Sequence, residues 1–67
     1  MKDLNVENVV VDEVHGRRYV VMARRILTDG ELYKAIRQEL MKRGGEYPRK
    51  GETLVIRFGQ AGTAGQP

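Results

Sequence analysis

The first part of the chain consists of two valine-rich segments whose pattern is typical of β-strands. Residues 4–14 contain the run "NVVVDEV", and residues 17–27 read "RRYVVMARRIL", so both segments are rich in β-branched and aromatic side chains. The pair His15–Gly16 separates them, and glycine readily adopts the positive φ that a tight turn requires. The pattern therefore predicts a β-hairpin with a two-residue turn.

Apolar residues recur at helical spacing in the middle of the chain. Thr28 and Glu31 stand three residues apart, as in a capping box, and predict that a helix begins at Thr28. The pair Gly44–Gly45 predicts its end, because glycine favours the left-handed conformation that closes many helices. The apolar stripe between these signals consists of Leu32, Ala35, Ile36 and Leu40.

A third strand and a tail complete the predicted order of elements. After a loop around Pro48, residues 53–58 alternate, with Leu54, Ile56 and Phe58 on one face. Residues 59–67 have no periodicity and are rich in glycine, so we expect a flexible C-terminal tail. The chain is thus predicted to form one small α+β domain over residues 1–58, with a ββαβ order. In this fold class, one helix packs on one face of a three-stranded sheet.

The two-residue turn would also set the register of the hairpin. It places Val9 opposite Met22 and Val11 opposite Val20, because cross-strand partners count outward from the turn. On this face the four apolar residues are bracketed by two opposite-charge pairs, Glu7–Arg24 and Glu13–Arg18. We therefore predict that this face packs under the helix.

The other face of the sheet is predicted to be exposed, because one helix cannot cover both faces. An exposed apolar patch usually marks an interface, and this patch could bind a second copy or another protein. Two alternatives are that terminal residues lie across it or that these are scattered surface valines. The predicted interface residues are Val10, Asp12, Tyr19, Val21 and Arg25.

The composition makes catalytic and metal-binding functions poor candidates. The 67 residues include no cysteine, no serine and a single histidine, so common nucleophiles and clustered metal ligands are missing. Asp12 and Glu13 are adjacent in a strand and point to opposite faces, so they do not form a catalytic carboxylate pair. We predict that the protein is not an enzyme and has neither cofactor nor metal. Self-association would then support so small a core.

Basic residues outnumber acidic ones, 12 to 9, which gives a formal charge of +3. A basic surface favours nucleic acid or an acidic protein as partner, although basic residues at a helix C-terminus also complement the dipole and keep a surface soluble. The predicted nucleic-acid-binding residues, the basic stripe, are Lys34, Arg37, Lys42, Arg43, Arg49 and Lys50.

No segment is long and apolar enough to span a membrane, and the N-terminus does not resemble a secretory signal, so we expect a cytoplasmic protein.

Two hypotheses for function follow from these features. The first is a small, basic, non-enzymatic binding module that forms a homodimer and contacts nucleic acid phosphates through the basic stripe. The alternative is a protein–protein interaction or inhibitor module that docks on a larger partner by its uncovered sheet face or a strand edge. A dimer with salt-sensitive nucleic-acid binding favours the first hypothesis. A monomer, or a dimer indifferent to nucleic acid, favours the second.

Overall fold

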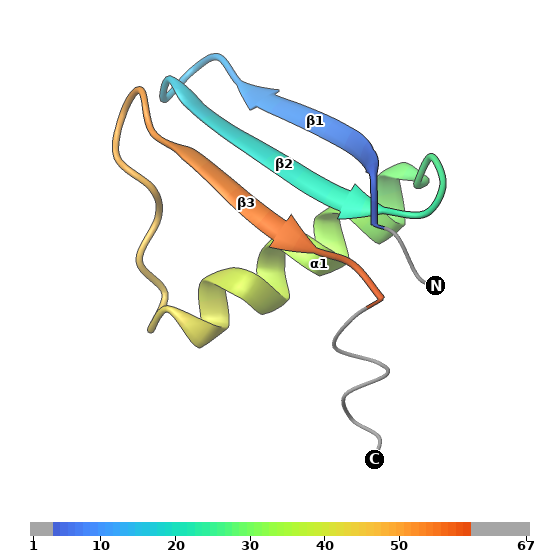
Figure 1. Cartoon of the computed structure of the whole chain (residues 1–67). Helices are drawn as coiled ribbons and strands as arrows, with labels where there is room; N and C mark the ends of the chain where they lie inside the picture. The colour runs from blue at the N-terminus through green and yellow to red at the C-terminus, as the bar shows by residue number, and fades with distance from the viewer. Residues whose placement is uncertain (1–3, 60–67) are drawn as a thin grey trace.

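A computed structural model describes residues 4–59 and contains three strands and one helix (Figure 1). The elements are β1 (Val6–Asp12), β2 (Arg17–Ala23), α1 (Asp29–Lys42) and β3 (Thr53–Arg57). β2 lies at the centre of the sheet, antiparallel to β1 and parallel to β3. The predicted ββαβ order and fold class are confirmed. Apart from Gly59, the tail predicted over residues 59–67 lies outside the described residues.

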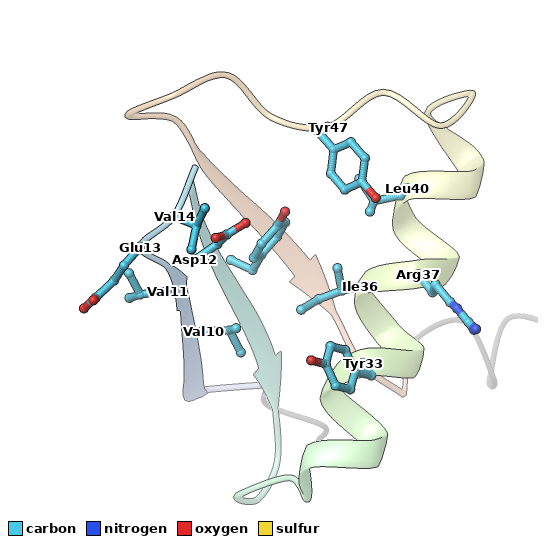
Figure 2. Close-up of a pocket in the computed structure, with 11 residues that line it drawn as sticks. Val10, Val11, Asp12, Glu13, Val14, Tyr33, Ile36, Arg37, Leu40 and Tyr47 are labelled. Atoms are coloured by element: carbon cyan, nitrogen blue, oxygen red, sulfur yellow. The ribbon is translucent and has the colours of Figure 1, made fainter. Parts of the chain in front are cut away.

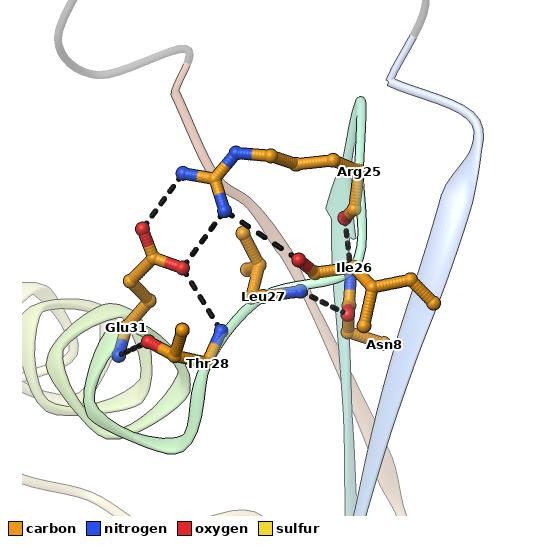
Figure 3. Close-up of polar contacts among 6 residues, drawn as sticks. All are labelled: Asn8, Arg25, Ile26, Leu27, Thr28 and Glu31. Atoms are coloured by element: carbon orange, nitrogen blue, oxygen red, sulfur yellow. Dashed lines mark hydrogen bonds and ion pairs between the residues drawn. The ribbon is translucent and has the colours of Figure 1, made fainter.

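The helix begins with the predicted capping box. The backbone N–H of Glu31 donates to the Thr28 hydroxyl at 3.2 Å, and the Thr28 N–H donates to the Glu31 carboxylate at 2.9 Å. Arg25 donates to both oxygens of the same carboxylate, at 2.9 and 2.7 Å (Figure 3). These hydrogen bonds, that from Arg25 above all, lower the pKa of Glu31 from 4.5 to about 2.

The helix ends at the predicted glycine pair through a Schellman motif. The N–H of Gly45 donates to the Leu40 carbonyl at 2.8 Å, and the N–H of Gly44 donates to the Met41 carbonyl at 3.1 Å. Gly44 has a φ of 74°, which few other residues adopt without strain. The chain therefore leaves the helix abruptly and returns toward the sheet.

The hydrophobic core lies between α1 and one face of the sheet, but this face is not the predicted one. Tyr19 and Val21 of β2 are 5% and 0% exposed, whereas Val9 on the opposite face is 52% exposed. The physical reason is the placement of charge, since the exposed face of the hairpin carries Glu7 and Arg18, whose burial without partners would be costly. The core residues are Tyr19, Val21, Ala23, Leu27, Ala35, Ile36, Leu40, Leu54 and Ile56.

The predicted register is also wrong, because the turn comprises residues 13–16 and Asp12 lies opposite Arg17. The Asp12 carboxylate accepts hydrogen bonds from the backbone N–H and the Nδ1 of His15, at 3.2 and 3.0 Å, and so stabilises a longer turn. Gly16 completes the turn with a φ of 69°. Val9 consequently pairs with Val20. A shift of two residues changes the cross-strand partners without exchanging the faces of the sheet. The wrong register and the wrong choice of covered face therefore have separate causes.

Asn8 is the one polar side chain in the core of the described residues, and it joins β1 to the segment between β2 and α1. Its Nδ2 donates to the carbonyl oxygens of Val21 and Arg25, both at 3.2 Å. Its Oδ1 accepts the backbone N–H of Leu27 at 2.8 Å (Figure 3). One amide thus satisfies three buried or half-buried backbone groups and fixes where the helix begins relative to the sheet.

We expect Asn8→Ala to reduce the free energy of unfolding by about 1–3 kcal/mol, because the Leu27 N–H would lose its acceptor. Urea denaturation monitored by circular dichroism measures this change. Asn5→Ala is the matched control, since Asn5 is exposed and makes no hydrogen bond with the described residues. Equal stability of the two variants would contradict the role given to Asn8.

The ion pair between Arg25 and Glu31 predicts a specific acid sensitivity. Because the pKa of Glu31 falls from 4.5 to about 2 on folding, its contribution to stability is complete above pH 4.5 and lost as the pH falls to 2. Glu31→Gln should therefore reduce the pH dependence of the melting temperature in this window. Asp29→Asn, which removes a carboxylate from the same helical turn, should retain the wild-type dependence. Parallel curves for wild type and Glu31→Gln would argue against this ion pair in solution.

Candidate interaction surface

The uncovered face of the sheet, called here the open face, has a row of valines across its centre. Val20 on β2 lies opposite Val9 on β1 and Val55 on β3. Val9 and Val55 are 52% and 58% exposed, and no described element lies over this side of the sheet (Figure 1). Removal of valine methyl groups from water lowers the free energy, so this row favours contact with another apolar surface.

Charged residues surround the valine row in a defined arrangement. One neighbouring row contains Glu7 on β1, Met22 on β2 and Arg57 on β3. The other contains Val11, Arg18 and Thr53 in the same order of strands. The open face therefore has an apolar centre. Glu7 places a negative charge at the β1 edge, Arg57 places a positive charge at the β3 edge, and Arg18 places a second positive charge on the other side of the row.

The structure does not bring the predicted interface residues together on this face. Tyr19 and Val21 are buried in the core, and Val10 packs against the core from β1. Asp12 closes the hairpin turn, and Arg25 holds Glu31 at the helix start. The prediction of one uncovered apolar face was correct, but the residues assigned to it lie on the covered side of the sheet or, for Arg25, in the segment before the helix.

The residues missed by the sequence analysis are those of the open face. Their signal was present in the charge pattern, because Glu7 and Arg18 alternate with valines on one face of the hairpin. Alternation of charged and apolar residues indicates contact with solvent, whereas Tyr19, Val21 and Ala23 form an uninterrupted uncharged set. The covered face also carries two charged residues, Asp12 and Arg17, but these lie opposite each other at the turn end of the hairpin. The position of the charges, rather than their number, therefore distinguishes the two faces.

A hollow lies between β1 and α1 on the covered side of the sheet. It has a volume of about 850 Å³ and is partly open to solvent. Val10 and Tyr19 line it from the sheet, while Ile36 and Leu40 line it from the helix (Figure 2). We call this hollow the β1–α1 groove.

The basic stripe is divided among three places. Lys34 and Lys42 lie on the β3 side of the helix, in a hollow shared with Ile56 and Phe58. Arg37 instead lines the β1–α1 groove with its side chain pointing away from it (Figure 2). The other three residues line a hollow beyond the helix end that also contains Glu46 and Glu52; they are Arg43, Arg49 and Lys50.

Comparisons with known proteins add no family or fold neighbour to these surfaces. The chain matches no family model, no curated protein and no solved structure. Within residues 4–59, no group of three or more metal-ligating side chains is placed to hold a metal ion. The same part of the chain contains no helix with the length and apolar character needed to cross a membrane.

Proposed function

We propose that the protein is a small binding module that forms a homodimer by packing its open face against the open face of a second copy. The observation that supports this proposal is the row formed by Val9, Val20 and Val55, which lies uncovered at the centre of the sheet. Two such faces would form a sandwich in which the helices lie on the outer sides. Two sheets commonly pack face to face in this way with their strands nearly aligned.

The charges around the valine row favour a second copy as the occupant. A twofold axis parallel to β2, between the two open faces, places β1 of each copy over β3 of the other, because these strands flank β2. Val9 then faces Val55, and Glu7 faces Arg57, twice in each dimer. The same operation brings the two Arg18 side chains together at the rim, where their length lets the guanidinium groups turn into solvent.

The size of the open face indicates a weak dimer. Two strands of seven residues and one of five, about 4.8 Å apart and with about 3.3 Å per residue, give a footprint of roughly 300 Å². A standard interface buries about 800 Å² on each partner, so this one is well below the standard size and falls in the range of weak, transient contacts. We therefore expect association in the micromolar range rather than a permanent dimer.

We expect Val20→Glu to abolish the dimer while preserving the fold, because it places a carboxylate at the centre of the valine row. Val21→Glu, one residue away, should instead prevent folding, because Val21 is 0% exposed in the core. Sedimentation equilibrium measures the mass, and circular dichroism measures the fold.

Thr53→Glu is the control for a charge added at the rim of the same face, and it should weaken the dimer less than Val20→Glu. A wild-type chain that remains monomeric at millimolar concentration would contradict the proposal. So would a Val20→Glu variant that dimerises as the wild type does.

A second candidate function, nucleic-acid binding, is favoured by the pairing of charges on α1. Glu31 pairs with Arg25, and Glu39 lies 3.8 Å from Lys42, so both glutamates of the helix are neutralised locally. Lys34 and Arg37 are exposed and form no ion pair within residues 4–59. Such a surface suits the phosphate backbone, and in the proposed dimer it would lie on the outside.

If one helix neutralises about four phosphates of a duplex, the logarithm of affinity should fall with the logarithm of salt concentration at a slope of about −3.6. Arg37→Glu should weaken binding equally on unrelated sequences, because phosphate contacts contain no base information. Fluorescence anisotropy with labelled duplexes over a range of salt concentrations measures both effects.

Arg24→Glu is the matched control, since it changes the net charge by the same amount at an exposed position outside the helix. If both variants bind with the same affinity and salt slope, the helix is not the contact surface, and the positive charge acts only through its total.

A further inference from the structure

The edge of the sheet at β1 presents backbone hydrogen-bonding groups in a regular pattern. The Met22 carbonyl accepts from the N–H of Phe58, which directly follows β3, at 2.8 Å, so the backbone groups of Met22 point toward β3. Backbone groups alternate in direction along a strand, so those of Val21 point toward its partner Asn8 on β1. By the same alternation, every second residue of β1 directs its N–H and C=O away from the sheet. This outward set is Glu7, Val9 and Val11.

The outward groups of β1 form no hydrogen bond within residues 4–59. β1 is seven residues long, pairs with β2 without a bulge, and contains neither proline nor lysine, the residues that commonly block an exposed edge. Such an edge pairs with a further extended chain, which brings unpaired backbone groups of its own. A helix does not fit this edge, because its backbone groups are already paired.

The β1–α1 groove lies beside this edge because the helix is too narrow for the sheet. An α-helix with its side chains is about 10–12 Å wide and strands lie about 4.8 Å apart, so α1 packs mainly on β2 and β3. Val10 of β1 is only partly buried, and Tyr33, which is 74% exposed, points from the helix toward it (Figure 2). Because side chains of a strand alternate between faces, every second side chain of a strand added at β1 would enter the groove.

The two ends of the groove differ. At the turn end, the Arg17 guanidinium carbon lies 4.5 Å from the centroid of the Tyr47 ring. Both carboxylate oxygens of Asp12 accept hydrogen bonds from His15. These side chains are therefore already engaged within the protein. At the other end, a further hollow of about 260 Å³ extends the groove to Asp29 at the start of the helix.

The helix-start end of the groove is acidic. Glu7 lies near the beginning of β1, opposite the end of β2, and both Glu7 and Asp29 are exposed without an ion pair in residues 4–59. These carboxylates complement a basic occupant. The β1 strand of a second copy fits poorly, because it contains two acidic residues and no basic one. The charge therefore favours a different protein as the occupant.

We propose that the β1 edge and the β1–α1 groove together bind an extended basic segment of a partner protein, which adds to the sheet as a strand antiparallel to β1. Its backbone bonds with the outward groups of β1, and its alternate apolar side chains enter the groove beside Val10 and Tyr33. Its C-terminal basic residues lie next to Glu7 and Asp29. The antiparallel direction is the more stable pairing. The proposal is independent of the open-face dimer, because neither the outward backbone groups nor the groove belongs to the open face.

Amide hydrogen exchange in the presence of the peptide TTITIKK, acetylated and amidated at its ends, tests the proposal on the intact chain. In the free protein the outward amides of Glu7, Val9 and Val11 should exchange rapidly, whereas that of Val10, which points toward β2, should be protected. Peptide at millimolar concentration should slow exchange at the three outward positions. Val20→Glu should show the same protection, so the test gives its result whether or not the open-face dimer forms.

Matched pairs of changes locate the binding. N-methylation of the threonine between the two isoleucines removes an N–H directed at β1 and should weaken binding about tenfold. N-methylation of the first isoleucine, whose N–H points away from β1, should weaken it much less. Tyr33→Ala should weaken binding about three- to tenfold through lost apolar contact. Met41→Ala, at an exposed position of the same helix outside the groove, should bind as the wild type does.

Unchanged exchange at the three outward amides with millimolar peptide would overturn the proposal. So would equal weakening by the two N-methylations, or equal binding of a peptide with glutamine in place of both lysines at low salt. Tighter binding of an amphipathic helical peptide in the groove would assign it to a helix instead. Protection of the same amides on concentrating the protein alone would show that a second copy occupies the edge, and would likewise contradict the proposal.

Discussion

The width of one helix relative to three strands determines the surfaces of this protein. A single α1 covers one face of the sheet across about two strands, so the opposite face remains bare and the covered face remains incomplete beside β1. The bare face contains the valine row, and the incompletely covered side next to β1 contains the tyrosine-lined groove. Both candidate binding surfaces thus have one geometric origin, although they differ in chemistry.

Short-range polar contacts fix the helix on this sheet. Asn8 ties β1 to the segment that leads into the helix, and the contacts among Arg25, Thr28 and Glu31 set the first turn. At the opposite end, the N–H of Gly51 donates to the carbonyl of Gly16 at 2.8 Å and joins the loop before β3 to the hairpin turn. With a core this small, such contacts decide which face the helix covers and which valines remain in water.

Local signals in the sequence predicted the elements, whereas the choice of face depended on the whole chain. The capping box at Thr28 and the glycine pair at Gly44 act within one helical turn, so they could be recognised from spacing alone. The two faces of the hairpin are both apolar, and the choice between them depends on the cost of burying Glu7 and Arg18. The register depended on the Asp12 side chain, which stabilises a longer turn than the position of glycine suggests.

The open face as a self-complementary surface is the central claim, and intermolecular nuclear Overhauser effects test it most directly. A concentrated mixture of ¹³C-labelled and unlabelled wild-type protein reports contacts between copies alone. The twofold arrangement predicts contacts from Val9 methyl groups to Val55 methyl groups, and between the Val20 side chains of the two copies. Contacts between copies that involve Val10 or Tyr33 instead, or none from the valine row in a sample of dimer mass, would contradict it.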